Sequence, residues 1–534
     1  MTVTLLRSDP GALVHNDAPL GPIVKINGAN LLVRADDGNE QRAKVGGLVK
    51  IGGENDVIGI VESIEISDTI PPRTIISIDL VGEIRQRNGQ RFFTRGVSNL
   101  PGISDYVRPA GKDVSTVVYA QPAAPSIPVG RLSGDPTQEA YLMSDELLAK
   151  HFAVVGSTGC GKSCTTTLLL SRIIERQPNA HIVMLDPHSE YATAFGDLAE
   201  VMDISSCRLP FWMLNLEEAT QILVRGGTNE EQEAQAIILK DALVKARLTN
   251  ADDYGGPTCV TVDSPIPFFI RDVQRNLEES MGRLNRGDGA GIYRRLLSRL
   301  DSLLQDRRYS FMFGDAYFAT DCLAELVGRF FRIPVAGKPL TIVDMSGVPS
   351  EVADVVVSVM GRALFDFALW SDPKRRPPIL LVCEEAHRYL PANEALGFAA
   401  CRRSISRIAR EGRKYGLSLA LISQRPSELS LEALSQCGTV VALRLGNGAD
   451  QRLVEAALPD TGRTMMRALS SMPPQEAVVF GEAVSLPIHL RFDDLTLERR
   501  PRSSSARFSV AWQDDTADEA FLSEAIRHWR MASI

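Results

Sequence analysis

At residues 156–163 the chain reads Gly-Ser-Thr-Gly-Cys-Gly-Lys-Ser, which matches the phosphate-loop pattern G-x-x-x-x-G-K-[ST] at every fixed position. An apolar stretch, 152–155, precedes the loop, and a segment of helical character, 165–174, follows it. This strand–loop–helix order is the context that the pattern requires. Glycines let backbone N–H groups wrap phosphates without obstruction by side chains. The stretch predicts nucleotide binding in an α/β domain; a chance match in a glycine-containing turn is the alternative.

Two residues of this loop carry chemistry of their own. We expect Lys162 to bring positive charge to the β- and γ-phosphates and the Ser163 hydroxyl to ligate Mg²⁺. ATP and Mg²⁺ are therefore the expected cofactors. The predicted nucleotide-binding residues are Gly156, Ser157, Thr158, Gly159, Cys160, Gly161, Lys162, Ser163 and Cys164.

Hydrolysis also needs an acid near the metal and a group that orients the attacking water. The apolar strand 378–383 ends in two adjacent acids, Glu384 and Glu385. Successive residues of a strand point in different directions. We therefore assign Glu384 to Mg²⁺ and Glu385 to activation of water. A solvated acidic pair at the start of a helix is the alternative.

A second acidic group, Asp-Pro-His-Ser-Glu-Tyr at 186–191, follows the apolar strand 181–185. We expect this strand to neighbour the phosphate-loop strand. Asp186 would then lie at the carboxyl end of the sheet, where ligands of open α/β sheets bind. Asp186 or Glu190 would then contact the metal, its waters or the catalytic base. A helix N-cap is the alternative for Asp186, and we interpret Asp344, at the end of another strand, as a structural cap.

A later apolar strand ends at Gln424, which we interpret as a sensor of the γ-phosphate, with a turn stopped by Pro426 as the alternative. Before this strand, Arg407, Arg410 and Arg413 recur at every third position and would form one stripe on a helix. Such a stripe could reach a neighbouring subunit's nucleotide. Spacing alone favours the alternative, a basic solvated face.

Patterns along the rest of the chain predict its organisation. Short strands with glycine-rich turns between 20 and 110 indicate a small all-β barrel. The proline- and alanine-rich stretch 121–128 is typical of a linker. Alternating strands and helices indicate a mainly parallel sheet covered on both faces. We predict an α/β fold in five parts: an N-terminal barrel (1–115), a linker and the first part of a RecA-like P-loop core (116–216), a helical insertion (217–335), the second part of the core (336–500) and a tail (501–534).

Composition limits the classes of function. No apolar run is clean enough to span a bilayer, and the N-terminal residues lack the apolar stretch of a signal peptide. We therefore expect a cytoplasmic protein with no membrane contact. The eight cysteines form no CxxC pair, so we expect reduced thiols. A net charge of −8 excludes a protein whose whole surface coats DNA, so any contact with nucleic acid must be local.

Six stretches together resemble the HerA family of FtsK-like translocases: GSTGCGKS, DPHSEY, LPFWMLNLEE, EEAH, IAREGRKYGLSLALISQRPSEL and VALRLGNGADQ. The resemblance implies a homohexameric helicase ring that hydrolyses ATP between subunits and threads double-stranded DNA through its centre. It implies that Lys162, Asp186, Glu385 and Gln424 lie in the active site. It also implies a trans-acting arginine finger, for which Arg410 is the first choice and Arg413 the second. Arg444 is a lesser candidate at the interface.

The same resemblance implies a partner effector protein: a NurA-type nuclease, or a sirtuin-like NADase or other nuclease in antiphage defence. Two departures from the family pattern are visible. Lys150 stands beside His151 where an arginine is usual, and Ser189 stands where glycine is more usual. Two other functions remain open at this point: a ring that acts mainly as a scaffold or sensor for the effector, and a secretion- or conjugation-type ATPase.

Overall fold

The computed structural model describes residues 18–36, 38–52, 56–67, 72–204, 209–283, 289–313, 321–393, 397–457, 463–502, 508–513 and 518–532. The chain forms two compact units, each built from separate stretches of sequence. The first unit contains Met1–Leu147, Val154–Gly161 and Cys437–Asp493. The second unit contains Leu148–Ala153, Lys162–Gln436 and Asp494–Ile534.

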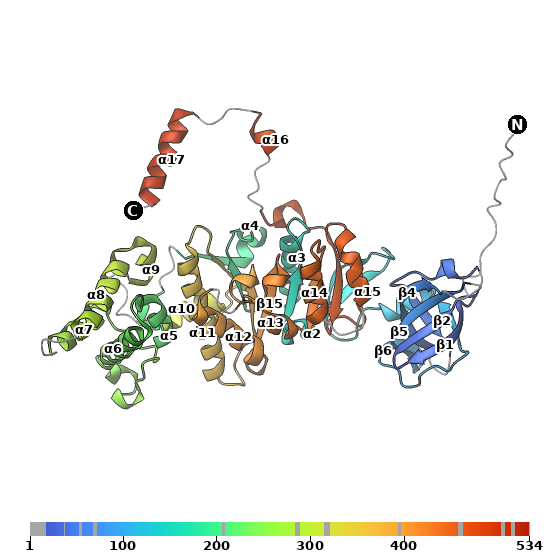
Figure 1. The fold of residues 1–534 in the computed structure, drawn as a ribbon, viewed down its shortest axis with the longest axis horizontal. Coiled ribbons are helices and arrows are strands. Elements are labelled where there is room, and N and C mark those ends of the chain that lie inside the picture. The colour runs from blue at the N-terminus through green and yellow to red at the C-terminus, as the bar shows by residue number, and fades with distance from the viewer. Residues whose placement is uncertain are drawn as a thin grey trace. The chain divides into compact units, whose positions relative to one another are not determined.

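The first unit begins with an antiparallel barrel, drawn in blue in Figure 1. Its strands are β1 (Gly21–Asn27), β2 (Asn30–Arg34), β3 (Leu48–Ile51), β4 (Asp56–Ile66), β5 (Thr74–Arg87), β6 (Gln90–Arg95) and β7 (Tyr106–Pro109). They follow the order β2-β1-β7-β3-β4-β5-β6, and an additional pairing of β2 with β5 closes the ring. The predicted barrel is confirmed.

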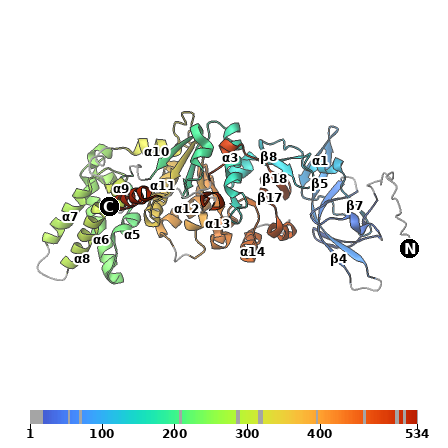
Figure 2. The same cartoon turned by 90° about the horizontal axis from the view of Figure 1, so that it is seen from above.

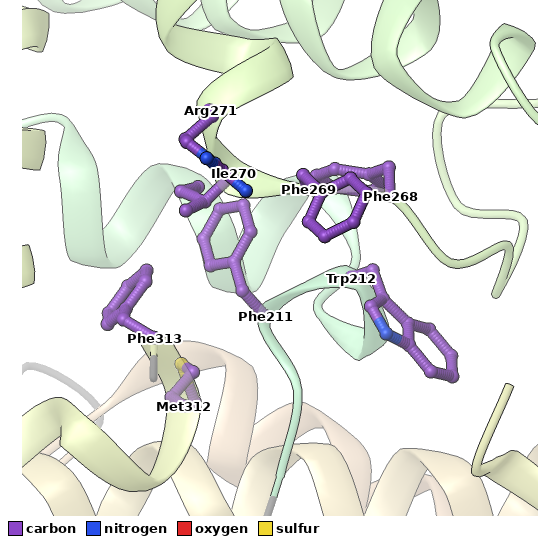
Figure 3. A pocket seen from close by; sticks show the side chains of 8 residues that line it. All are labelled: Phe211, Trp212, Phe268, Phe269, Ile270, Arg271, Met312 and Phe313. Carbon is purple, nitrogen blue, oxygen red and sulfur yellow. The ribbon is translucent and has the colours of Figure 1, made fainter. Parts of the chain in front are cut away.

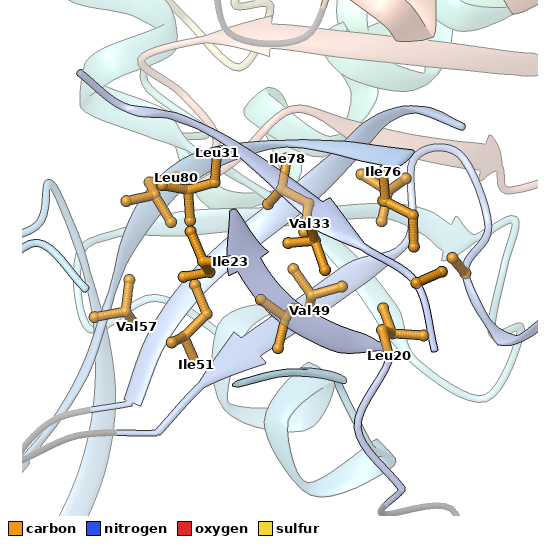
Figure 4. Packing of buried hydrophobic residues seen from close by; sticks show 14 residues of the cluster. Leu20, Ile23, Leu31, Val33, Val49, Ile51, Val57, Ile76, Ile78 and Leu80 are labelled. Carbon is orange, nitrogen blue, oxygen red and sulfur yellow. The ribbon is translucent and has the colours of Figure 1, made fainter. Parts of the chain in front are cut away.

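Alternating side chains fill the barrel. Ile23, Leu31, Val33, Ile76 and Ile78 are each at most 1% exposed and point into one core (Figure 4). Because successive side chains of a strand face opposite sides, this alternation places the β-branched residues inside and the polar residues between them outside.

A second group of strands completes the first unit. It comprises β8 (Ser126–Leu132), β9 (Glu139–Met143), β16 (Thr439–Ala442), β17 (Glu476–Gly481) and β18 (Ile488–Phe492), in the antiparallel order β16-β17-β18-β8-β9. Its helices are α1 (Lys112–Val118), α14 (Gly448–Ala457) and α15 (Arg463–Met466). The predicted linker 121–128 is only partly a linker, because β8 begins at Ser126 and pairs with β9. Arg95 ties the barrel to this group by donating to the carbonyl oxygens of Gly481 and Ser485, both at 2.6 Å.

The second unit is built on a parallel sheet. Its strands are β11 (Ile182–Asp186), β12 (Ala199–Asp203), β13 (Leu340–Asp344), β14 (Ile379–Cys383) and β15 (Leu417–Ser423), in the order β12-β13-β11-β14-β15. The phosphate-loop strand, β10 (Phe152–Val155), contributes residues to both units. The predicted mainly parallel sheet is confirmed.

One predicted neighbour relationship is wrong. The strand that ends at Asp186, β11, pairs with β13 and β14 and not with the phosphate-loop strand. Parallel strands are joined by crossovers, which can pass over intervening strands, so order along the chain does not fix order in the sheet.

Helices cover this sheet and form a separate helical group. Those near the sheet are α2 (Ser144–Ala149), which spans the boundary between the units, α3 (Lys162–Arg176), α4 (Ala192–Phe195), α11 (Ser350–Trp370), α12 (Ala399–Glu411) and α13 (Leu431–Ser435). The predicted helical insertion contains α5 (Leu216–Leu223), α6 (Asn229–Leu248), α7 (Ile270–Gly282), α8 (Ala290–Gln305), α9 (Ser310–Phe313) and α10 (Leu323–Phe331). Figures 1 and 2 show α6, α7 and α8 side by side. Near the C-terminus lie α16 (Phe508–Ala511) and α17 (Glu519–Ala532).

A buried arginine organises the segment that enters the helical insertion. Arg247 is 1% exposed and donates to the carbonyl oxygens of Ser264 at 2.7 Å and Leu214 at 2.9 Å. Its guanidinium lies 5.0 Å from the ring centroid of Phe268. Phe268 in turn meets Phe211 edge to face, and Figure 3 shows these two rings. These contacts hold the aromatic stretch in place because the buried cation finds carbonyl and ring partners.

Among the described residues, no helix is both long enough and apolar enough to cross a bilayer.

Candidate functional site

The phosphate loop adopts a conformation that requires glycine. Gly159 and Gly161 have φ angles of +76° and +105°, and a Cβ on Gly156 would lie 2.6 Å from the sulfur of Cys160. Residues with a side chain disfavour the positive φ of Gly159 and Gly161, and at Gly156 there is no space for a side chain. The loop is also anchored, because Ser157 donates from both its backbone nitrogen and its hydroxyl to the carbonyl oxygen of Arg444, each at 2.9 Å. Arg444 thus serves the loop through its backbone.

The chain passes from this loop directly into α3, which begins at Lys162. The first amides of a helix have no partner within the helix, so its N-terminus favours an anion. Lys162 is only 8% exposed there. Beside it, the hydroxyl of Ser163 donates to Oε2 of Glu190 at 2.8 Å. The second unit therefore places a lysine, a hydroxyl and a carboxylate at one helix end.

Asp186 and Glu190 have different positions in the structure. Asp186 is fully buried, and its two carboxylate oxygens accept from the backbone nitrogens of His188 and Tyr191, both at 3.1 Å. Burial raises the pKa of Asp186, although these two hydrogen bonds lower it. Asp186 thus shapes the turn, and the turn presents Glu190 to Ser163. Asp344 accepts from Ser189 at 2.6 Å, which fits a structural role.

The two glutamates that follow β14 are both buried. Glu384 is 4% exposed, and burial raises its pKa to about 8, with a further increase from the charge of Glu385. The nearby Lys162 lowers the pKa of Glu384. Oε2 of Glu384 is buried and accepts no hydrogen bond from any described residue. A buried, unpartnered carboxylate oxygen beside a lysine and a second acid fits a site that a cation completes.

Glu385 is held in an unusual backbone conformation. It is 6% exposed and has φ 50° and ψ 48°, the left-handed region that a residue with a long side chain rarely adopts. Strain of this kind persists where the surrounding structure enforces it, and it concentrates at functional sites. The left-handed conformation turns the chain directly after Glu384, so the two carboxylates of a short segment can serve different partners.

His387 links Glu385 to the end of β15. Its Nδ1 lies 3.3 Å from Oε2 of Glu385 and 3.3 Å from Oγ of Ser423. The same Oγ accepts from the backbone nitrogen of Arg425 at 3.1 Å. Gln424 lies between these two residues, so the predicted sensor immediately follows the strand end that His387 contacts. The motif EEAH carries this histidine, but its role was not anticipated in the sequence.

The three predicted arginines do not form one helical stripe. Arg407 packs against α11, with its guanidinium 3.9 Å from the ring centroid of Phe365. Arg410 forms two hydrogen bonds to the carboxylate of Glu432, at 2.7 and 2.8 Å. Arg413 lies in a 3₁₀ turn, Gly412–Tyr415, because α12 ends at Glu411. The prediction of a continuous helix through Arg413 is therefore wrong, and the side chains of Arg410 and Arg413 are both exposed.

Comparison with known proteins agrees with this geometry. Residues 127–364 match the family described as "Helicase HerA, central domain". The chain is 24% identical over 476 residues to the probable DNA double-strand break repair helicase HerA of Methanocaldococcus jannaschii, covering 82% of this chain and 88% of that protein. It is 26% identical over 425 residues to the DNA double-strand break repair helicase HerA of Pyrococcus furiosus, covering 72% of each protein. The central part of the chain is thus similar to HerA-family helicases.

The fold also resembles a solved structure, VirB4 of Thermoanaerobacter pseudethanolicus. The TM-score is 0.50 at 15% identity, over 71% of this chain and 99% of that one. At this level of identity the likeness concerns the fold alone. The phosphate loop, the buried glutamates and the similarity to HerA helicases identify the chain as a P-loop enzyme that hydrolyses ATP.

Proposed function

We propose that this HerA-family ATPase is a hexameric translocase that moves double-stranded DNA by hydrolysing Mg²⁺-ATP. The observation that carries the hydrolytic part is the position of Glu385, buried and conformationally strained at the end of β14 and adjacent to Glu384, whose buried Oε2 has no hydrogen-bond partner among the described residues. The names of the curated relatives, which describe DNA double-strand break repair helicases, support DNA as the substrate of the motor.

Six residues of the second unit have a role in the hydrolytic part of this proposal. Lys162 binds the phosphates at the start of α3. Ser163, Glu190 and Glu384 supply the oxygen ligands, direct or through water, that Mg²⁺ prefers. Mg²⁺ would neutralise charge on the phosphate oxygens. Glu385 accepts a proton from, and orients, the attacking water, and Nδ1 of His387 lies 3.3 Å from its carboxylate.

The ring supplies the remaining parts. An arginine finger from a neighbouring subunit stabilises charge that develops in the transition state. Arg410 and Arg413 are the candidates, because both side chains are exposed at the end of α12. Gln424 would report the presence of the γ-phosphate to β15. The net charge of −8 places DNA contacts on local basic segments, since the protein as a whole would repel the phosphate backbone.

We also propose that the ring works with a separate effector, a nuclease or a sirtuin-like NADase, in antiphage defence. This part rests on the family resemblance alone. A ring that serves as a scaffold or sensor, and a conjugation-type ATPase that moves protein, are the two alternatives.

The deciding experiment measures phosphate release by the purified chain with Mg²⁺ and ATP, with and without linear duplex DNA, alongside its native mass. We expect the mass of six chains, stimulation by duplex DNA, and loss of turnover by at least about 100-fold in Glu385→Gln with retained nucleotide binding. Turnover without any response to DNA favours the scaffold. Phosphate release equal in the wild type and in Glu385→Gln would refute the proposed site.

A further inference from the structure

One buried histidine lies outside the motifs that the proposed function uses. His151 directly precedes β10, the strand that leads into the phosphate loop. Its side chain is 4% exposed, and its backbone has φ 54°, which is uncommon for a residue other than glycine or asparagine. A strained, buried, polar side chain needs partners that hold it in place.

Both ring nitrogens of His151 have such partners, and both partners are distant in sequence. Nδ1 accepts from the backbone nitrogen of Leu419 in β15 at 2.9 Å, across 268 residues. Nε2 lies 3.1 Å from the carbonyl oxygen of Ala409 in α12, across 258 residues. One side chain therefore joins the start of the phosphate-loop strand to the sensor strand and to the helix of the arginines.

These two contacts fix the tautomer. A backbone N–H can only donate, so Nδ1 must be unprotonated, and Nε2 then carries the hydrogen and donates to Ala409. Burial lowers the pKa of His151, and the positive charge of Arg413 lowers it further. The ring is therefore neutral, with one donor and one acceptor that are both used.

The partners of His151 lead to residues with proposed roles. Ala409 immediately precedes Arg410, and the turn that carries Arg413 begins three residues after it. Leu419 lies in β15, whose last residue, Ser423, contacts His387. A displacement of the phosphate-loop strand would thus be transmitted through a single imidazole to the backbone of α12.

We propose that His151 is a positioning residue that couples the phosphate loop of one subunit to the arginines that the same subunit offers to its neighbour. The inference rests on the proposed function, since it assumes that Arg410 or Arg413 acts in trans. The hydrogen bond to Ala409 sets the position of the arginines, and the bond to Leu419 holds the ring in the orientation that makes this possible.

Two substitutions separate the two bonds. In His151→Asn the amide oxygen takes the place of Nδ1 and keeps the acceptor for Leu419, but nothing reaches Ala409. In His151→Gln the longer side chain places an N–H near the position of Nε2 and keeps the donor for Ala409. Asparagine also tolerates positive φ better than histidine or glutamine, so backbone strain cannot explain a defect of His151→Asn.

We expect His151→Asn to lower kcat by about 10- to 100-fold, since small displacements of catalytic groups have effects of this size. The Kd for a fluorescent ADP analogue should stay within about twofold of the wild type, because the loop itself is intact. His151→Gln should retain more of the kcat than His151→Asn. As a matched control, His181→Gln removes a similar bond, from His181 Nδ1 to the carbonyl oxygen of Phe331 at 3.0 Å, and should leave kcat unchanged.

Mixed rings give the readout that a purely structural role would not produce. A His151→Asn subunit keeps its own hydrolytic residues, and a Glu385→Gln subunit keeps correctly positioned arginines. If His151 acts through the arginines in trans, mixing the two defective proteins should restore phosphate release. Without restoration, or with equal losses of kcat and of ADP binding in His151→Asn, His151 serves only its own subunit and the inference is overturned.

If His151→Asn does not fold, His151→Ala, which makes neither bond, mixed with Glu385→Gln gives the same test. A wild-type ring that releases no phosphate would instead overturn the proposed function, and this inference with it. The two failures are distinguishable, because failure of the His151 inference alone is seen only when the wild-type ring is active.

Discussion

The hydroxyl of Ser163 and the carboxylate of Glu190 are joined by a hydrogen bond of 2.8 Å, across 27 residues of sequence. Ser163 lies in the first turn of α3, and Glu190 lies in the turn that Asp186 organises through two backbone amides. The acid that reaches the phosphate-loop serine is therefore Glu190, and Asp186 acts one step further away.

From this relationship we predict that Glu190→Gln weakens the response to Mg²⁺. The concentration of Mg²⁺ for half-maximal phosphate release should rise by about 10- to 100-fold, the usual cost of altering a residue that supports a metal site. Binding of ADP in the presence of EDTA should be unchanged. Glu175→Gln is the control, because Glu175 lies on the same helix but is exposed and pairs with Arg172 at 3.1 Å. Equal Mg²⁺ dependence of the two variants would contradict the assignment.

Glu384 should make the stability of the nucleotide-free enzyme depend on pH. Burial raises its pKa to about 8 in the folded protein, whereas an unfolded glutamate titrates near 4.3. The folded state then keeps a proton that the unfolded state loses, so stability falls as pH rises through this interval. We expect the melting temperature in EDTA to decrease from pH 5 to pH 8, and Glu384→Gln to flatten this decrease. Identical slopes for the two proteins would show that Glu384 does not carry the effect.

The ion pair between Arg410 and Glu432 bears on the identity of the arginine finger. Both side chains are exposed, so we expect Glu432→Gln to leave the melting temperature unchanged. Arg410→Ala should lower kcat by about 10³-fold if Arg410 is the finger, and Arg413→Ala should lower it less. Mixing Arg410→Ala with Glu385→Gln subunits should restore turnover, because each supplies what the other lacks. Restoration only with Arg413→Ala would transfer the role to Arg413.

A buried ion pair should contribute to the stability of the second unit. Glu218, on α5, is 1% exposed and accepts from Arg362 at 3.1 Å and from Ser358 at 2.9 Å, both on α11. Glu218→Ala removes the closer counter-ion of the buried Arg362 and leaves only Asp366, at 3.4 Å, so we expect a loss of about 3 kcal/mol in the free energy of unfolding.

The double variant Glu218→Leu/Arg362→Met provides the control for this prediction. It removes both charges and replaces them with apolar side chains, so we expect it to recover most of the lost stability. Chemical denaturation of the two variants measures the difference. A double variant as unstable as Glu218→Ala would indicate that packing, and not the uncompensated charge, causes the loss.

The amino-acid sequence by itself determined the elements whose physics is local. The phosphate loop was predictable because its glycines, lysine and serine lie within eight consecutive residues, and their spacing specifies the backbone conformation. The parallel strands were predictable because strands buried on both faces read as continuous apolar runs. The barrel strands were predictable because strands buried on one face alternate apolar and polar residues. Glu384 and Glu385 follow an apolar strand, which is sufficient to place them at its carboxyl end.

Only the tertiary structure decided which distant residues meet. It placed β11 between β13 and β14, assigned Glu190 rather than Asp186 to Ser163, and paired Arg410 with Glu432. It also brought His151 to Leu419 and Ala409, which lie 268 and 258 residues away along the chain. No local pattern encodes such contacts, because they depend on crossovers that set strand order and on side-chain directions fixed by packing.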